Sequence, residues 1–169
     1  MQSEAKPEGR EVASHSLAEL LACPPATANL LNSSAESMEF EFGETIFRQG
    51  EACRGLYVVA SGQLQRKADR LQARVVLGTV HAGDLVELAA ALGDGHHTYT
   101  LVAKSPGSLM ILPRNTLEAA FDMYPPLRMQ LLEELAREVS RAYISCCAAR
   151  TAGIRRRGTR TIENPGQPV

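Results

Sequence analysis

T-V-H-A-G-D-L-V-E-L-A-A-A-L-G-D-G-H-H-T-Y-T-L-V-A, residues 79–103, is the segment from which the fold of this chain is most directly predicted. It begins as a β-like run, turns at Gly83 and continues into a short apolar segment of helical character. A glycine-rich loop with histidines follows at residues 93–97, and the segment ends as alternating strand. A short helix after a glycine turn, with basic side chains in the next loop, is an arrangement suited to an anion such as phosphate. The segment therefore predicts one wall of an anion-binding pocket.

Short strands separated by glycines precede this segment. From Met38 the apolar period changes from helical to alternating, and glycine turns recur at spacings of roughly eight to twelve residues as far as Gly83. This pattern is typical of an all-β roll or barrel. The most charged part, residues 66–74, is interpreted as a solvated hairpin tip, because runs of charge usually mark exposed loops.

The composition divides the chain into three parts. Residues 1–16 are polar and non-periodic, and they are predicted to form a disordered N-terminus. Residues 17–150 are predicted to form one domain, with the β-roll over about residues 38–114 and C-terminal helices over about residues 115–150. Residues 151–169 are rich in arginine and are predicted to be a basic disordered tail.

The long helix predicted after Pro125 and Pro126 contains a short heptad pattern. Its apolar positions lie three and four residues apart, which is the spacing of a coiled-coil seam. These positions are Leu132, Leu135, Val139, Ala142, Cys146 and Ala149. An alternative is that the helix packs on the protein's own roll, through the adjacent line of Leu127, Leu131 and Tyr143.

Composition also excludes several classes of function. The chain has 169 residues, of which 44% are hydrophobic, so it can bury one substantial core. Its formal net charge of −1 is not that of a general nucleic-acid-binding protein. It has neither a transmembrane run nor a signal peptide, so we expect no membrane association and a cytoplasmic location. The 4 cysteines form no C-x-x-C pair, so neither a zinc site nor a redox dithiol is indicated.

No catalytic motif is recognisable. The sequence contains no G-x-S-x-G, no P-loop and no H-E-x-x-H. We therefore expect a protein that is not an enzyme.

Three ordered motifs resemble one known family. F-G-E-T-I-F-R-Q-G-E at residues 42–51, G-L-Y-V-V-A-S-G-Q-L at 55–64 and L-G-T-V-H-A-G-D at 77–84 are similar to the cyclic-nucleotide-binding domain superfamily in order and spacing. The branch that they resemble most is the sensor domain of the catabolite-activator and fumarate-nitrate-reduction regulators. The resemblance, over residues 38–150, implies a mainly β fold with flanking helices. It implies a jelly-roll-like β-roll of eight strands, a phosphate-binding cassette between the sixth and seventh strands, and a long C-terminal dimerisation helix.

The cassette departs from the family pattern in its key residues. Members that bind cyclic nucleotide carry G-E-L-A, whose glutamate holds the ribose hydroxyl, followed by an arginine that holds the phosphate. In one register Glu87, Leu88 and Ala89 match E-L-A, and Val86 replaces the glycine. In the other register Glu87 replaces the glycine and Leu88 replaces the glutamate. In both registers His97 replaces the arginine.

These departures weaken the expected phosphate contacts. A branched valine restricts the backbone where glycine is expected, and histidine lacks the permanent charge and forked donors of arginine. Loss of a buried bidentate charge pair costs roughly 2 to 5 kcal/mol, so tight binding of cyclic AMP in the usual mode is not expected. The residues predicted to bound the ligand pocket are Gly83, Asp84, Val86, Glu87, Leu88, Ala89, His97, Thr98 and Tyr99.

The resemblance also raises the question of cofactors. The oxygen-sensing branch holds an iron–sulfur cluster through a cysteine group near its N-terminus and one cysteine in the roll. Here the N-terminal part offers Cys23 alone and Cys53 lies elsewhere, so a cluster is not expected. Other relatives bind haem, for which His81, His96 and His97 are candidate ligands, although the favoured interpretation of the histidine pair is a polar surface loop.

We therefore expect a stand-alone regulatory sensor domain, dimeric through its long helix, that responds to a ligand or cofactor other than cyclic AMP bound in the usual mode. Family regulators continue into a helix-turn-helix module, which residues 151–169 are too short to form, so sequence-specific DNA binding is not expected. Two alternatives stay open. One is a ligand-free module for dimerisation or docking of a partner protein, and the other is an ordinary cyclic nucleotide-binding regulatory protein that retains Glu87.

Overall fold

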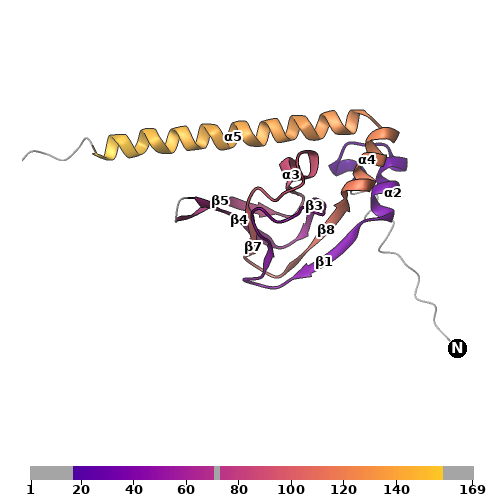
Figure 1. The fold of residues 1–169 in the computed structure, drawn as a ribbon, viewed down its shortest axis with the longest axis horizontal. Coiled ribbons are helices and arrows are strands. Elements are labelled where there is room, and N and C mark those ends of the chain that lie inside the picture. The colour runs from indigo at the N-terminus through magenta and orange to yellow at the C-terminus, as the bar shows by residue number, and fades with distance from the viewer. Residues whose placement is uncertain (1–16, 71–72, 158–169) are drawn as a thin grey trace, which may run out of the picture. The chain divides into compact units, whose positions relative to one another are not determined.

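The short strands pair into two antiparallel sheets of four strands each (Figure 1). Side chains alternate along each strand, so the apolar residues of a strand can share the face that is turned to the core. The computed structural model describes residues 17–70 and 73–157. The first sheet has the order β1 (Glu36–Phe40), β8 (Gly107–Pro113), β3 (Gly55–Ser61) and β6 (Leu85–Val86). The second has the order β2 (Thr45–Phe47), β7 (Thr100–Ala103), β4 (Gln63–Arg70) and β5 (Ala73–His81). The predicted β-roll with flanking helices is confirmed.

The core of the roll is built from buried side chains of both sheets, and the inner strands β3, β4, β7 and β8 contribute half of them. Tyr57 of β3 is paired with Ile111 of β8 on one side and with Val86 of β6 on the other. Full burial of one such side chain contributes roughly 1.5 to 3 kcal/mol, so the core dominates the stability of the roll. The core residues are Phe40, Phe47, Cys53, Tyr57, Val59, Leu64, Val80, Val86, Ala90, Tyr99, Leu101, Ala103, Leu109 and Ile111.

Among the described residues, four labelled helices accompany the strands, besides a short helical turn at residues 17–20. They are α2 (Pro25–Ser33), α3 (Leu88–Leu92), α4 (Arg114–Met123) and α5 (Pro126–Arg157). Helix α2 packs against α4, and α3 joins β6 to the loop that leads into β7. Among the residues that the structure describes, no helix has both the length and the apolar character that a membrane span requires.

Helix α5 extends past the predicted boundary at residue 150 and ends at Arg157. A single interior glycine such as Gly153 costs only about 1 kcal/mol relative to alanine, which a long helix tolerates. The chain divides into two compact units between Leu132 and Glu133, so the beginning of α5 belongs to the unit that contains the roll. The predicted disordered N-terminus at 1–16 and the remainder of the predicted tail at 158–169 lie outside the described residues.

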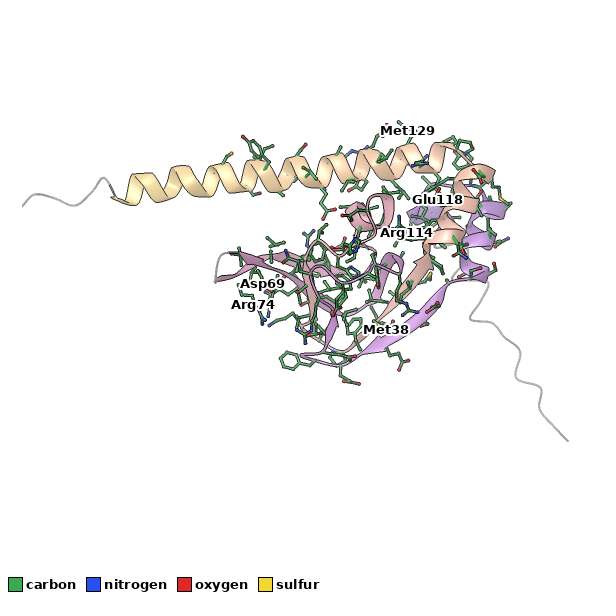
Figure 2. The ribbon with its side chains drawn as sticks, viewed as in Figure 1. Met38, Asp69, Arg74, Arg114, Glu118 and Met129 are labelled. Atoms are coloured by element: carbon green, nitrogen blue, oxygen red, sulfur yellow. The ribbon has the colours of Figure 1, made fainter. Side chains whose placement is uncertain are left out.

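The charged segment at residues 66–74 belongs to the hairpin of β4 and β5, as the sequence predicts. Near its tip the Arg74 Nε atom lies 3.3 Å from Asp69 Oδ1, and both side chains are exposed (Figure 2). An exposed pair of this kind contributes little to stability. The charges of Asp69 and Arg74 are therefore explained by solvent exposure, whereas Arg66 is half-buried and its guanidinium lies over the Tyr99 ring.

Gly55 allows β3 and β8 to approach each other closely, and this yields a first prediction. A Cβ atom at Gly55 would overlap the carbonyl oxygen of Leu112, which belongs to the paired strand. Gly55→Ala should therefore lower the free energy of unfolding by about 3 kcal/mol, at the upper end of the cost of overpacking, as measured by urea denaturation.

Gly43→Ala is the matched control. Gly43 has a φ of +82° but no atom within 4 Å of an added Cβ, so only backbone strain of about 1 kcal/mol is expected there. Equal losses of stability in the two variants would contradict the close approach at Gly55.

Candidate functional site

Two loops that are distant in sequence meet at the cassette. Residues 50–53, after β2, and residues 95–97, before β7, are joined by backbone hydrogen bonds of 2.7 to 2.8 Å. The shortest of these runs from the Cys53 N–H to the carbonyl oxygen of Gly95. This pairing brings Cys53 next to residues 95–97, which lie more than 40 residues further along the chain.

The loop of the cassette is also held by helix α4. The guanidinium of Arg114, labelled in Figure 2 at the start of α4, donates a hydrogen bond of 3.1 Å to the carbonyl oxygen of Gly93. Gly95 has a φ of +77°, and a Cβ atom there would overlap this guanidinium. The backbone conformation therefore favours glycine at position 95, and a larger residue would also displace the Arg114 guanidinium.

Glu87 forms the turn between β6 and α3. Its backbone is left-handed, with φ 69° and ψ 34°, although such a conformation costs a non-glycine residue about 1 to 2 kcal/mol. The residue is 2% exposed, and its carboxylate accepts hydrogen bonds from the backbone N–H of Thr98 at 3.3 Å and from the Thr98 hydroxyl at 3.2 Å. Its own N–H donates to the hydroxyl oxygen of Tyr99 at 3.2 Å. Contacts with the residues that precede β7 thus fix the carboxylate inside the protein.

His97 lies against this carboxylate. Its ring stacks on Phe47, with centroids 3.7 Å apart and planes 3° from parallel. The Nδ1 atom of His97 is 3.3 Å from Glu87 Oε2, and the two side chains are 1% and 0% exposed. Despite this proximity the geometry of a hydrogen bond is not met, and within the described part of the chain Nδ1 has no hydrogen-bond partner. The imidazole and the carboxylate are close together without being aligned on each other.

The thiol of Cys53 completes a cluster with these two side chains. It is buried and donates to the carbonyl oxygen of Gly55 at 3.1 Å. Burial raises the pKa of the Cys53 thiol above its usual value, an effect that the Gly55 hydrogen bond and Arg114 oppose and that Glu87 reinforces. Donor atoms of Cys53, Glu87 and His97 all lie within 4.8 Å of one another. Thiol, carboxylate and imidazole are all ligands of transition metals, so this group could hold a metal ion.

Aromatic rings enclose the cluster on the side of the core. The ring of Tyr57 lies 5.1 Å from that of Phe47 and 5.7 Å from that of His97, measured between centroids. Burial, reinforced by the neighbouring Cys53, raises the pKa of Tyr57 to about 12. Tyr57 is therefore a neutral wall of the site at physiological pH.

The residues predicted to bound the pocket have different environments. Val86, Leu88 and Tyr99 are buried in the core, and Glu87 and His97 are buried beside each other. Ala89 is half-buried, whereas Gly83, Asp84 and Thr98 are exposed. The structure thus brings Glu87, His97, Thr98 and Tyr99 together at one site.

The remaining predicted positions lie in exposed turns. The Asp84 carboxylate accepts a hydrogen bond of 2.8 Å from the backbone N–H of His81, and Gly83 belongs to the same turn. Among the candidate haem ligands, His81 and His96 are exposed, with Nδ1 atoms about 4 Å from Asp84 and Asp94 respectively. The ring of His97 is instead covered by Phe47.

Sequence reasoning missed Cys53 and Phe47 as members of this site. Neither residue belongs to a local motif that carries metal or ligand chemistry, and no metal site was predicted. Only the pairing of residues 50–53 with residues 95–97 brings the thiol to the cassette.

Comparison with known proteins places the chain in a family. Residues 37–124, more than half of the chain, match the family model of the cyclic nucleotide-binding domain. The chain is 28% identical over 124 residues to the fumarate and nitrate reduction regulatory protein of Escherichia coli (strain K12), which covers 69% of this chain and 49% of the relative. The protein of that name from Salmonella typhimurium gives the same values. The chain thus spans about half the length of these curated relatives.

Solved structures agree with this match. The catabolite activator protein of Thermus thermophilus is 25% identical, with a TM-score of 0.66 over 75% of this chain and 60% of that one. The sensor domain of the transcriptional regulator DNR from Pseudomonas aeruginosa shares the fold, with 22% identity and a TM-score of 0.64 over 77% of this chain and 87% of that one. The chain belongs to the cyclic nucleotide-binding domain family, in the branch of the catabolite-activator and fumarate-nitrate-reduction regulators.

Proposed function

We propose that this chain is a regulatory sensor domain whose cassette responds to a ligand other than cyclic AMP bound in the usual mode. The observation that carries the proposal is the buried carboxylate of Glu87 in the turn before α3. The relatives are regulatory proteins by name, and a non-enzymatic role and a cytoplasmic location stay predictions.

The backbone at Glu87 favours one of the two possible registers. Glycine adopts a left-handed conformation without strain, and the left-handed residue of this turn is Glu87, whereas Val86 ends strand β6. This supports the register in which Glu87 stands in place of the family's glycine. Leu88 then stands in place of the ribose-binding glutamate, and its side chain is buried at 2% exposure. On this register the ribose contact is lost.

Charge in the cassette also argues against a phosphate. Glu87 brings an acidic group, and His97 stands in place of the phosphate-binding arginine with its Nδ1 atom beside that group. Two like charges about 4 Å apart repel by about 4 kcal/mol at the effective dielectric constant of a partly buried site. A bound cyclic phosphate would meet this repulsion without the arginine guanidinium that normally offsets it.

The haem hypothesis stays a prediction, and the stacking of His97 on Phe47 gives it no support.

We further propose that α5 carries a homodimer contact. The predicted seam positions Leu132 and Val139 lie seven residues apart and are 38% and 60% exposed, and Tyr143 of the adjacent line is 71% exposed. Of the other predicted seam positions, Leu135 is half-buried and Ala142 is exposed, while the side chains of Cys146 and Ala149 lie outside the described residues. An exposed apolar stripe on a long helix indicates a protein partner, and a second copy satisfies the heptad spacing. Docking of a different protein on the same stripe is the alternative.

The proposal predicts that cyclic nucleotides do not stabilise the protein. Cyclic AMP or cyclic GMP at millimolar concentration should leave the Tm unchanged in a thermal-shift measurement. A ligand present at about 100 times its Kd would add roughly 2.7 kcal/mol, which such a measurement detects easily. The regulatory domain of Toxoplasma gondii PKA, which has been crystallised with cyclic AMP, is the positive control.

Paired variants test the register as well. The triple variant Glu87→Gly, Leu88→Glu, His97→Arg should gain a Tm increase with cyclic AMP, because it restores the family pattern on the favoured register. The double variant Val86→Gly, His97→Arg restores the pattern on the other register and should gain none. A cyclic AMP response in the unaltered chain, or in the double variant alone, would refute the proposal.

The dimer is tested by size in solution. At micromolar concentration sedimentation should give twice the mass of the chain, and Val139→Glu should convert it to a monomer, because a charge at a seam position is desolvated on association. Ser140→Glu places the same charge at an exposed neighbouring position away from the stripe and should remain dimeric. A monomeric unaltered chain would exclude the dimer contact.

A further inference from the structure

We propose that Cys53, Glu87 and His97 bind one divalent transition-metal ion of the zinc type, through thiolate, carboxylate and imidazole. This inference rests on the proposed function, because it names the class of ligand that the altered cassette accepts. Each ligand comes from a different segment: the loop after β2, the turn between β6 and α3, and the loop before β7. Backbone hydrogen bonds hold residues 50–53 against residues 95–97. No hydrogen bond joins His97 Nδ1 to the Glu87 carboxylate, so both remain available to a metal ion.

The distances fit a tetrahedral ion. Metal bonds of about 2.0 to 2.3 Å place neighbouring donor atoms of a tetrahedron about 3.3 to 3.8 Å apart. The separation between His97 Nδ1 and Glu87 Oε2 is already 3.3 Å. Since all the donor atoms lie within 4.8 Å of one another, a movement of Cys53 Sγ by about 1 Å completes the geometry. Rotation of one side chain can supply that movement.

The free state leaves polar groups that a metal would satisfy. His97 Nδ1 is buried and, among the described residues, lacks a hydrogen-bond partner, although a carboxylate oxygen is 3.3 Å away. A buried polar atom without a partner costs about 1 to 3 kcal/mol, and a buried carboxylate needs a compensating charge. A divalent cation between the two groups removes both penalties. An imidazolium–carboxylate pair would also do so, but it would align the N–H on the carboxylate, and that alignment is absent.

The surroundings hold the three ligands in place. The Thr98 hydroxyl and N–H fix the Glu87 carboxylate, and the parallel ring of Phe47 fixes the imidazole plane. The backbone hydrogen bond from Cys53 to Gly95 fixes the position of the thiol-bearing residue. Such outer contacts orient metal ligands, and their loss typically weakens metal binding 10- to 100-fold.

The donor set selects the kind of ion. Mg²⁺ and Ca²⁺ take oxygen ligands, whereas a thiolate with an imidazole favours Zn²⁺ and its neighbours in the first transition row. On binding, the metal–sulfur bond replaces the S–H bond of Cys53, and the proton leaves to the buffer. Three protein ligands leave a fourth position for water or a small molecule. The cassette would thus respond to the metal itself or to what the bound metal recruits.

Cobalt provides a direct test, because Co²⁺ occupies zinc sites and reports its ligands by absorbance. The full chain, reduced and stripped of metal with a chelator, should bind one equivalent of Co²⁺. The spectrum should show a thiolate-to-metal charge-transfer band and the intense visible bands of tetrahedral Co²⁺, and Zn²⁺ should displace both. Cys53→Ser should abolish the charge-transfer band, and His97→Gln should raise the Kd for Zn²⁺ at least 100-fold.

Two further variants separate ligation from folding. Cys147→Ser removes an exposed thiol and should keep the full spectrum. Thr98→Val removes the side-chain hydroxyl that donates to Glu87 Oε1. It should weaken Zn²⁺ binding 10- to 100-fold, while the metal-free protein stays folded with a lower Tm, because the buried carboxylate loses one hydrogen-bond donor. This variant keeps the proposal testable if Cys53→Ser does not fold.

The outcomes are distinct from those of the cyclic nucleotide test. Absence of Co²⁺ binding at 100-micromolar protein, or a Co²⁺ spectrum that is unchanged by Cys53→Ser, overturns the metal site and leaves the insensitivity to cyclic nucleotides standing. A Tm increase with cyclic AMP overturns the proposed function whatever the cobalt result.

Discussion

The buried carboxylate of Glu87 is the constraint on which the cassette depends. A charged group with 2% exposure has lost its hydration, so the surrounding protein must supply partners for it. Two hydrogen bonds from Thr98 supply part of this need, and the His97 Nδ1 atom lies 3.3 Å from the carboxylate without forming a hydrogen bond to it. The left-handed backbone of Glu87 is strained, and the hydrogen bond from its N–H to the Tyr99 hydroxyl helps to stabilise this conformation. The turn at Glu87 and its hydrogen bonds with Thr98 and Tyr99 accommodate this one side chain.

A site organised around a carboxylate favours a cationic ligand, whereas the phosphate-binding cassette of the family favours an anion. In the family pattern the turn offers backbone N–H groups and an arginine to an anion. Here the same place offers an acidic group, an imidazole and, through the pairing of residues 50–53 with 95–97, a thiol. Each of these three groups can donate electrons to a cation. We propose that the fold is retained while the chemistry of its ligand site is reversed.

The parts of the structure that depend on local pattern could be predicted from the sequence. Alternation and glycine turns predicted the β-roll, because each strand of the roll is short and is bounded by its own turn. The left-handed conformation of Glu87 could not be predicted, because a residue type that avoids this region is held there by tertiary contacts. Cys53 was missed for a similar reason, since its proximity to His97 depends on loop pairing across the fold. Helix α5 continues past the predicted end to Arg157, since an interior glycine such as Gly153 costs a long helix only about 1 kcal/mol.

The most direct measurement of the central claim is an NMR titration of the ¹⁵N-labelled chain with Zn²⁺ and, separately, with cyclic AMP. Zn²⁺ should shift the amide signals of Cys53, His97 and Thr98 at one equivalent, because these residues carry or orient the ligands. Cyclic AMP should leave the same signals in place at millimolar concentration. Shifts of these amides with cyclic AMP and none with Zn²⁺ would contradict the account.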